Sequence, residues 1–295
     1  MKEIIQFNNI EQFMTIFMCE LELYLLSNID DLKKISFQLD EANTDRPLKE
    51  YLKNVIETRC NSIKDLSGIK TIQYLNEIKS WCVITDDIKS VFVNRVLLPD
   101  EITDDIKDIL RTRKAATFTN PDLCLELNVQ GKLLYETVEL KSTKDNSIPG
   151  SSVQQVSPYE WVIFIKHNNN NIDVATGRYI NAINSRLQFP DRSPRPQVSF
   201  NELKEWNIEN RHICDDSISF KSRNDEKLKE KLLTDWQSVL AERWISIVFN
   251  DEKRKNEPWF NNNIRKFVVL FLNEYEKLSE SDKCLYIAKL NDLID

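Results

Sequence analysis

The chain has 295 residues, of which 41% are hydrophobic and 29% charged, and its formal net charge is −7. This composition is ordinary for a globular protein with one large domain or two. No apolar run approaches the ~20 residues that span a membrane, and the first residues match no signal-peptide pattern, so we expect a cytoplasmic protein without a membrane partner.

Counts of a few residue types exclude several common chemistries. The six cysteines are scattered without a CxxC pair, which argues against a zinc module and against a disulfide framework. With two histidines, a histidine metal cluster and most histidine-dependent triads are nearly excluded. The four glycines form neither GxGxxG nor GxxxxGK[ST], so we expect no nucleotide cofactor.

The first hundred residues are predicted to be mainly helical. Apolar residues recur at helical spacing over 10–28 and again over roughly 48–65, where Leu52, Val55 and Ile56 share one side. Residues 70–83 and 84–96 are predicted as two further helices, or as a helix and a short strand around 91–98. A helix is expected from Thr103, because acidic residues occupy its first turn.

Three apolar runs separated by turn residues predict a small sheet between Thr119 and His167. The first run begins with Asp122, a Gly131 turn leads into KLLYETVELKST, and YEWVIFIKH follows after a polar loop. Side chains alternate along a strand, so Glu139 and Lys141 point to the same face. The asparagine run 168–171 predicts a hairpin turn, and residues 172–174 a return strand.

The carboxylates of Asp122 and Glu139 could hold a hard divalent ion together with the Leu140 carbonyl. Magnesium takes one or two carboxylates and fills its octahedron with water and phosphate oxygens. Lys141 would lie beside the attacking water, where it could either help to deprotonate that water or stabilise the pentavalent state. The sequence alone leaves both roles open.

Pro121-Asp122 followed by Glu139-Leu140-Lys141 resembles the PD-(D/E)xK nuclease superfamily, most closely its type II restriction endonucleases. The resemblance covers roughly the middle third of the chain and implies an α/β (α+β) fold, with a mixed central sheet flanked by helices. It also implies Mg²⁺-dependent hydrolysis of double-stranded DNA and a homodimer. Many such nucleases bring an extra carboxylate from an upstream helix, for which Glu57 is the candidate; its other interpretation is an exposed surface glutamate.

Two polar segments near the predicted site are candidates for DNA contact, although the net charge of −7 requires the basic residues to gather in one cleft. The first segment follows Lys141, and the second is rich in arginine and in prolines that stiffen the chain. Amide and guanidinium groups of this kind read base edges or bind phosphates. The candidates are Lys144, Asn146, Ser147, Ser151, Ser152, Gln154, Gln155, Arg178, Arg186, Arg192, Arg195 and Gln197.

The remainder of the chain is predicted to be helical, over 225–249, from Asn262, and after an N-cap at Ser281. We therefore expect a helical N-terminal region (1–99), a catalytic core with DNA-contacting loops (100–200) and a helical C-terminal region (201–295), all within one compact unit. The C-terminal helices could serve as a dimer interface, a clamp over DNA or packing for the sheet.

Three alternative functions stay open. The first is a repair or nicking endonuclease with the same site. The second is a non-catalytic DNA-binding or protein-interaction protein in which Glu139 and Lys141 are inert. The third is a hydrolase for another substrate, which is disfavoured because the chain shows no Ser-His or Cys-His motif.

Overall fold

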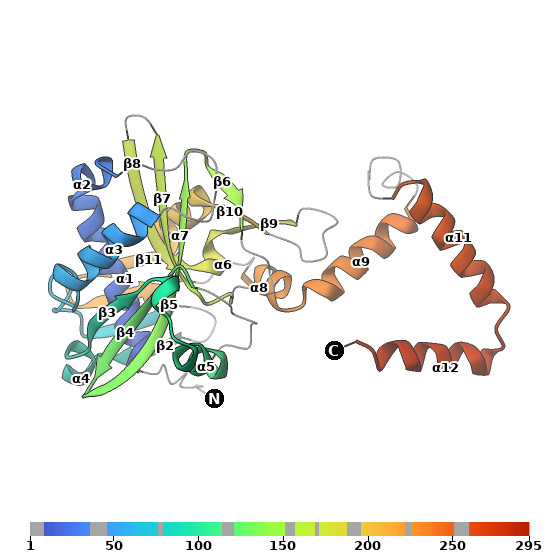
Figure 1. Cartoon of the computed structure of the whole chain (residues 1–295), viewed down its shortest axis with the longest axis horizontal. Helices are drawn as coiled ribbons and strands as arrows, with labels where there is room; N and C mark the ends of the chain where they lie inside the picture. The colour runs from blue at the N-terminus through green and yellow to red at the C-terminus, as the bar shows by residue number, and fades with distance from the viewer. Residues whose placement is uncertain are drawn as a thin grey trace. The chain divides into compact units, whose positions relative to one another are not determined.

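A computed structural model describes residues 9–35, 46–75, 79–113, 121–150, 157–168, 171–187, 196–221, 226–250 and 260–294 (Figure 1). The chain divides into two compact units, residues 1–236 and 237–295. The described residues of the first unit form a mixed α+β structure with three sheets, and those of the second are helical. Helices therefore occupy both the N-terminal and the C-terminal region, as predicted.

The main sheet has five strands in the order β3-β4-β5-β7-β8. Their bounds are Phe92–Leu97, Leu123–Val129, Lys132–Thr143, Trp161–Asn168 and Asn171–Arg178. All neighbours are antiparallel except β5 and β7, which are parallel, so the predicted mixed sheet is confirmed. Residues 130 and 131 form the tight turn between β4 and β5, and both have positive φ, 52° at Gln130 and 82° at Gly131.

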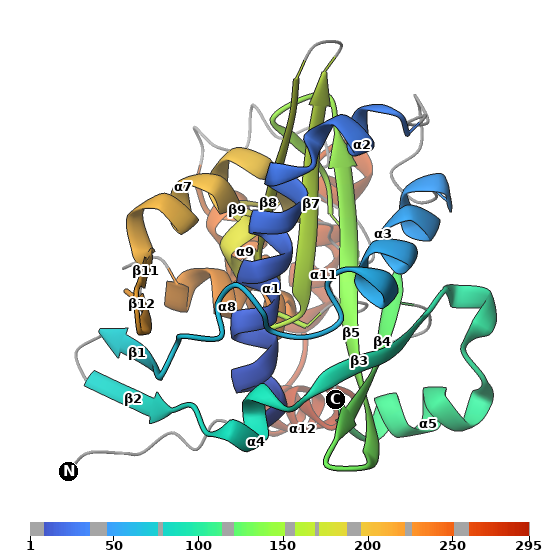
Figure 2. The same cartoon turned by 90° about the vertical axis from the view of Figure 1, so that its left-hand side faces the viewer.

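Helices cover both faces of this sheet. On one face α1 (Asn9–Ser27), α2 (Ile29–Lys33) and α3 (Arg46–Thr58) share a hydrophobic core with β3, β4, β5, β7 and β8. Figure 2 shows α1 and α3 in front of these strands. On the other face α5 (Asp104–Arg113) packs near β4. Over β7 and β8 on that face lie α6 (Tyr179–Ala182), α7 (Phe200–Asn210) and α8 (Glu226–Thr234).

Two segments predicted to be helical are strands instead. Residues 70–83 form β1 (Thr71–Leu75) and β2 (Lys79–Val83), and β11 (Arg211–Cys214) and β12 (Ser217–Phe220) interrupt the expected C-terminal helices. Together they make a four-stranded sheet, in which β1 and β12 are parallel neighbours. The paired residues Thr71 and Ser217 are 146 positions apart in the sequence. Pairing between such distant segments overrides local propensity, which is why the prediction was wrong.

Smaller elements complete the first unit. The strand predicted around 91–98 is confirmed as β3, and the helix predicted from Thr103 is confirmed as α5. A third sheet has the order β6-β10-β9. The remaining bounds are β6 (Ser147–Pro149), β9 (Ile183–Leu187), β10 (Pro196–Ser199), α4 (Asp86–Lys89) and the 3-10 helix η1 (Pro99–Glu101).

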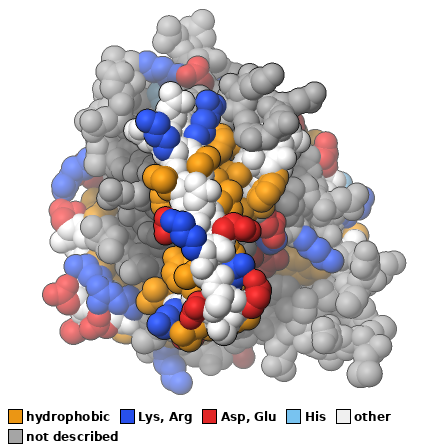
Figure 3. All heavy atoms as spheres, turned by 90° about the vertical axis from the view of Figure 1, so that its right-hand side faces the viewer, with side chains coloured by type: hydrophobic (Ala, Val, Ile, Leu, Met, Phe, Trp, Pro, Cys, Tyr) orange, Lys and Arg blue, Asp and Glu red, His pale blue; other side chains and the backbone are white. Residues whose placement is uncertain are grey.

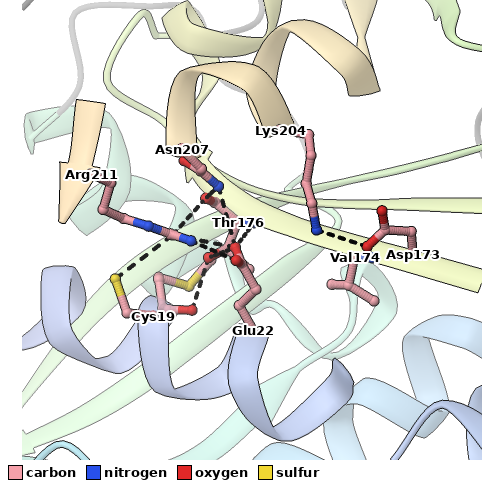
Figure 4. Close-up of polar contacts among 9 residues, drawn as sticks. Cys19, Glu22, Asp173, Val174, Thr176, Lys204, Asn207 and Arg211 are labelled. Atoms are coloured by element: carbon pink, nitrogen blue, oxygen red, sulfur yellow. Dashed lines mark hydrogen bonds and ion pairs between the residues drawn. The ribbon is translucent and has the colours of Figure 1, made fainter. Parts of the chain in front are cut away.

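A buried polar network joins α1, β8, α7 and β11 (Figure 4). The Glu22 carboxylate accepts hydrogen bonds from the Thr176 backbone N–H at 2.6 Å and from both terminal nitrogens of Arg211. The Thr176 carbonyl accepts from Asn207 Nδ2 at 3.0 Å. Because β8 is an edge strand, side chains here satisfy backbone groups that a further strand would otherwise pair.

The second unit begins within α9 (Trp236–Val248) and continues with α11 (Asn262–Glu276) and α12 (Glu280–Asn291). The predicted helix over 225–249 is divided into α8 and α9, and the N-cap of α12 is Ser279 rather than Ser281, because Ser279 Oγ accepts the Asp282 N–H. Neither α11 nor α12 has a buried residue. Figure 3 shows hydrophobic side chains (orange) on one face of the molecule. In α11 the side chains of Phe267 and Leu270 are each 63% exposed.

None of the described helices combines the length and the apolar character needed to cross a membrane.

Candidate functional site

Asp122 lies at the point where the pairing between β4 and β5 ends. The last pair of that ladder joins Leu123 to Val138, and Asp122 Oδ2 then accepts the Leu140 backbone N–H at 2.9 Å. The carboxylate thus takes the place of the next backbone partner. In a strand the N–H and C=O of one residue point to the same side, so the Leu140 carbonyl also points toward the edge that Asp122 occupies.

Glu139 and Lys141 share the face of β5 opposite α1 and α3, as the alternation predicts. Their strand partners Val162 and Phe164 belong to the core formed with α6 and α7. Lys141 Nζ donates to Glu139 Oε1 at 2.6 Å, and the Lys141 side chain is only 3% exposed. The sequence-predicted pair is therefore a largely buried ion pair and not a solvated one.

A lysine that the sequence analysis did not single out also contacts the site. Lys49 of α3 donates from Nζ to Asp122 Oδ1 at 2.6 Å, and its side chain is 10% exposed. Both oxygens of Asp122 therefore accept a hydrogen bond, one from Lys49 and one from Leu140. A signal was available: Lys49 precedes Leu52 by three positions and Ile56 by seven, so it belongs to the buried stripe of the helix.

The charges of the site act on one another. Burial and the nearby Glu139 carboxylate raise the pKa of Asp122, against the opposing attraction of Lys49 and Lys141. For Lys141, burial lowers the pKa, but electrostatic interactions with Glu139, Tyr179 and Asp122 and the hydrogen bond to Glu139 outweigh it, so the pKa lies above its ordinary value. Lys141 is therefore a charged ammonium at neutral pH.

The donor set fits a hard divalent cation. Asp122 and Glu139 interact electrostatically, and each carboxylate oxygen has more than one lone-pair direction, so the existing hydrogen bonds leave coordination possible. The Leu140 carbonyl adds a neutral oxygen at the same edge, and two carboxylates with one carbonyl suit magnesium. No cluster of three or more His, Cys, Asp or Glu side chains suited to a metal occurs among the described residues.

Glu57 is not brought into this site. Its Oε1 accepts the backbone N–H of Val96 in β3 at 2.8 Å. Glu57 follows Lys49 by eight positions in α3, which is about 12 Å along the helix axis at 1.5 Å per residue. The residue of α3 that reaches Asp122 is Lys49, and Glu57 instead joins the helix to the edge of the sheet.

The candidate DNA contacts lie in different environments. Arg178 makes contacts within the fold, because its guanidinium pairs with Glu11 at 2.9 Å and stacks over the Trp161 ring at 3.5 Å. Lys144 is exposed. Ser151, Ser152, Gln154, Gln155, Arg192, Arg195 and the side chain of Arg186 lie outside the described residues.

The remaining candidates, Asn146, Ser147 and Gln197, lie together near the small sheet of β6, β9 and β10. Gln197 Nε2 donates to Ser147 Oγ at 2.7 Å, and its Oε1 accepts from Asn184 at 2.7 Å. Asn146 accepts from Lys166 Nζ. Ser147 and Gln197 are 50 residues apart in the sequence, and their hydrogen bond brings them together in one polar surface.

Tyr179 is a second residue that sequence analysis passed over as part of the site. Its side chain is fully buried at the start of α6, and it interacts electrostatically with Lys141. Its backbone N–H donates to the Glu160 carbonyl at 2.8 Å. No sequence signal marks this position, because the contact depends on how α6 crosses the sheet.

Comparison of the chain with models of protein families, with curated proteins and with solved structures gives no match.

Proposed function

We propose that this chain is a type II restriction endonuclease of the PD-(D/E)xK kind, which hydrolyses phosphodiester bonds in double-stranded DNA with Mg²⁺. The observation that carries the proposal is the juxtaposition at the end of the β4–β5 ladder. There Asp122 accepts the Leu140 N–H, and Glu139 and Lys141 form a buried pair on the same strand. A Glu139–Lys141 ion pair with a purely structural role would require neither the Asp122 carboxylate nor a Leu140 carbonyl that points toward that carboxylate.

Each residue has a role in the proposed reaction. Asp122, Glu139 and the Leu140 carbonyl would hold the magnesium ion, which supplies polarisation of the scissile phosphate and of the attacking water. Lys141 carries its proton in this arrangement, which favours stabilisation of charge on the pentavalent phosphorus over proton abstraction. Burial strengthens that effect, because an ammonium acts more strongly where water is scarce.

The surface that carries Lys144, Asn146, Ser147 and Gln197 is proposed to contact DNA. It follows directly from the strand that bears Lys141, so a duplex bound there would be near the reacting phosphate. A homodimer, which the resemblance implies, would let two copies of the site cut both strands.

The decisive test is incubation of the purified protein with unmodified, sequence-diverse DNA in Mg²⁺ and in EDTA. Discrete fragments that require Mg²⁺ and are absent with Asp122→Asn, Glu139→Gln and Lys141→Met would support the proposal. Glu136→Gln is the matched control, because it removes a carboxylate from the same strand at a position that points to the opposite face. Activity of this variant should match wild type.

Two results would contradict the proposal. Intact DNA under all conditions, with wild type folded by circular dichroism, would remove the catalytic assignment. Cleavage that persists in Glu139→Gln and Lys141→Met would show that the reaction occurs elsewhere. Nicks in one strand, or cuts that follow DNA structure instead of one short sequence, would indicate a repair or nicking endonuclease with the same residues.

A further inference from the structure

Lys49 already contacts one of the two Asp122 oxygens that would hold a metal ion. Its Nζ lies 2.6 Å from Asp122 Oδ1, and the flanking Leu48 and Leu52 are fully buried in the core. The backbone of α3 is therefore fixed at this point. A magnesium ion bound by the same carboxylate would lie 2.0–2.1 Å from its oxygen, so the two cations would repel each other at short range.

The charges of the described residues around Asp122 balance without a metal. In this part of the chain Glu139, Lys49 and Lys141 are the charged groups that act most strongly on Asp122, so two carboxylates face two ammonium groups. A bound dication gives this cluster an excess of two positive charges in a partly buried site. The anion that can offset this excess is a phosphate of the substrate, since the site is one where a phosphate oxygen would approach the metal.

We propose that Lys49 couples metal binding to DNA binding. In the free protein Lys49 neutralises Asp122 and opposes a divalent ion. When DNA is bound, a phosphate oxygen accepts the hydrogen bond from the Lys49 ammonium, and the metal ion replaces Lys49 as the partner of Asp122. The inference rests on the proposed nuclease function, and it assigns to Lys49 a positioning role distinct from that of Lys141.

The coupling is measurable without any reaction. Ca²⁺ affinity is determined by calorimetry, with and without a mixed-sequence duplex, for wild type and Lys49→Gln, which keeps an N–H donor for Asp122 but removes the charge. In wild type, DNA should raise Ca²⁺ affinity about 10-fold or more, within the range typical of coupled sites. Lys49→Gln should bind Ca²⁺ more tightly without DNA, and DNA should then change its affinity less than about 3-fold.

Two matched variants separate charge at this position from charge on the helix in general. Lys49→Arg keeps the cation and should retain the wild-type coupling. Lys53→Gln removes a lysine one turn further along α3, where it pairs with Glu101 at 2.6 Å, and should also behave as wild type. By reciprocity, Ca²⁺ should raise DNA affinity by the same factor in each protein.

Three outcomes would overturn the inference. Absence of coupling between Ca²⁺ and DNA in wild type refutes the inference, whatever the variants do. Wild-type Ca²⁺ affinity and coupling in folded Lys49→Gln would leave the nuclease proposal intact but remove the role of Lys49. If Asp122→Asn does not weaken Ca²⁺ binding, the metal site itself is wrong, and both proposals are refuted.

Discussion

Replacing Arg211 with methionine leaves the Glu22 carboxylate buried without its cationic partner. In the native structure Arg211 donates to both oxygens of Glu22, and its side chain is 11% exposed against 7% for Glu22. Glu22 also fixes the Thr176 N–H on the edge strand β8. The substitution should therefore loosen the contact between α1 and the sheet as well as remove a charge pair.

The expected loss is about 3–5 kcal/mol in the free energy of unfolding, the range for removing one partner of a buried ion pair. The first unit comprises residues 1–236, and for chains of this size 1 kcal/mol corresponds to roughly 2–4 °C. The melting temperature should then fall by about 6–20 °C. A companion variant, Glu22→Gln with Arg211→Met, should recover most of the loss, because glutamine keeps an acceptor for Thr176 without a buried charge.

Urea denaturation followed by far-UV circular dichroism measures these differences, with Lys204→Met as the control. Lys204 of α7 pairs with Asp173 of β8 (Figure 4), but both side chains are partly exposed, so loss of this pair should cost less than about 1 kcal/mol. A loss for Arg211→Met as small as that of the control would refute the reasoning. So would a double variant no more stable than Arg211→Met.

Three further predictions concern single positions. Burial raises the pKa of Cys19 to about 11 and that of Cys60 to about 12. At pH 8 a thiol reagent should therefore label Cys19 and Cys60 slowly and the exposed Cys214 and Cys284 quickly. Mass spectrometry of the digested protein measures the four rates. Equal labelling rates would contradict this. Burial opposes the charge of Glu126, but hydrogen bonds from Arg95, Asn94 and Tyr135 outweigh it and lower its pKa. Glu126 should therefore stabilise the protein above the ordinary glutamate pKa and cease to do so as the pH falls through the lowered one. The free energies of unfolding of wild type and Glu126→Gln, from urea titrations, should differ at pH 7 and converge in acid. A difference that stays constant with pH would show that the ionised Glu126 carboxylate is not its cause. Gly131→Ala should lower the free energy of unfolding by about 1 kcal/mol. The residue has φ of 82°, and no neighbouring atom lies within 4 Å of the added methyl group, so only the backbone is strained. Gly131→Asn should cost less, since asparagine tolerates this conformation, and an unchanged urea midpoint for the alanine variant would refute the cause.

The central strands could be predicted because their signal is local. Asp122, the Gly131 turn and the alternation through Lys141 determine the face on which each side chain lies, and the structure places Glu139 and Lys141 together on that basis. Helix α1 was equally predictable from its apolar periodicity. These elements need no information from distant parts of the chain.

What could not be predicted depends on contacts between distant segments. β1 becomes a strand because β12 pairs with it, and Tyr179 meets Lys141 only after β8 and α6 have crossed the sheet. Lys49 is an intermediate case, because its place on the apolar stripe of α3 was visible but its partner Asp122 lies 73 residues away. Glu57 was chosen for its charge, although the packing of α3 directs it to Val96.

The bond between Asp122 and the Leu140 amide makes the site a continuation of the strand ladder. Amide hydrogen exchange at Leu140 therefore reports whether the carboxylate is in place, since local opening of that end of the ladder exposes this proton to water. In wild type the amide should exchange slowly, and in Asp122→Ala much faster, while the amides in the middle of β5 remain protected. Assembly of the proposed catalytic centre could thus be followed by NMR in the absence of DNA, metal and turnover.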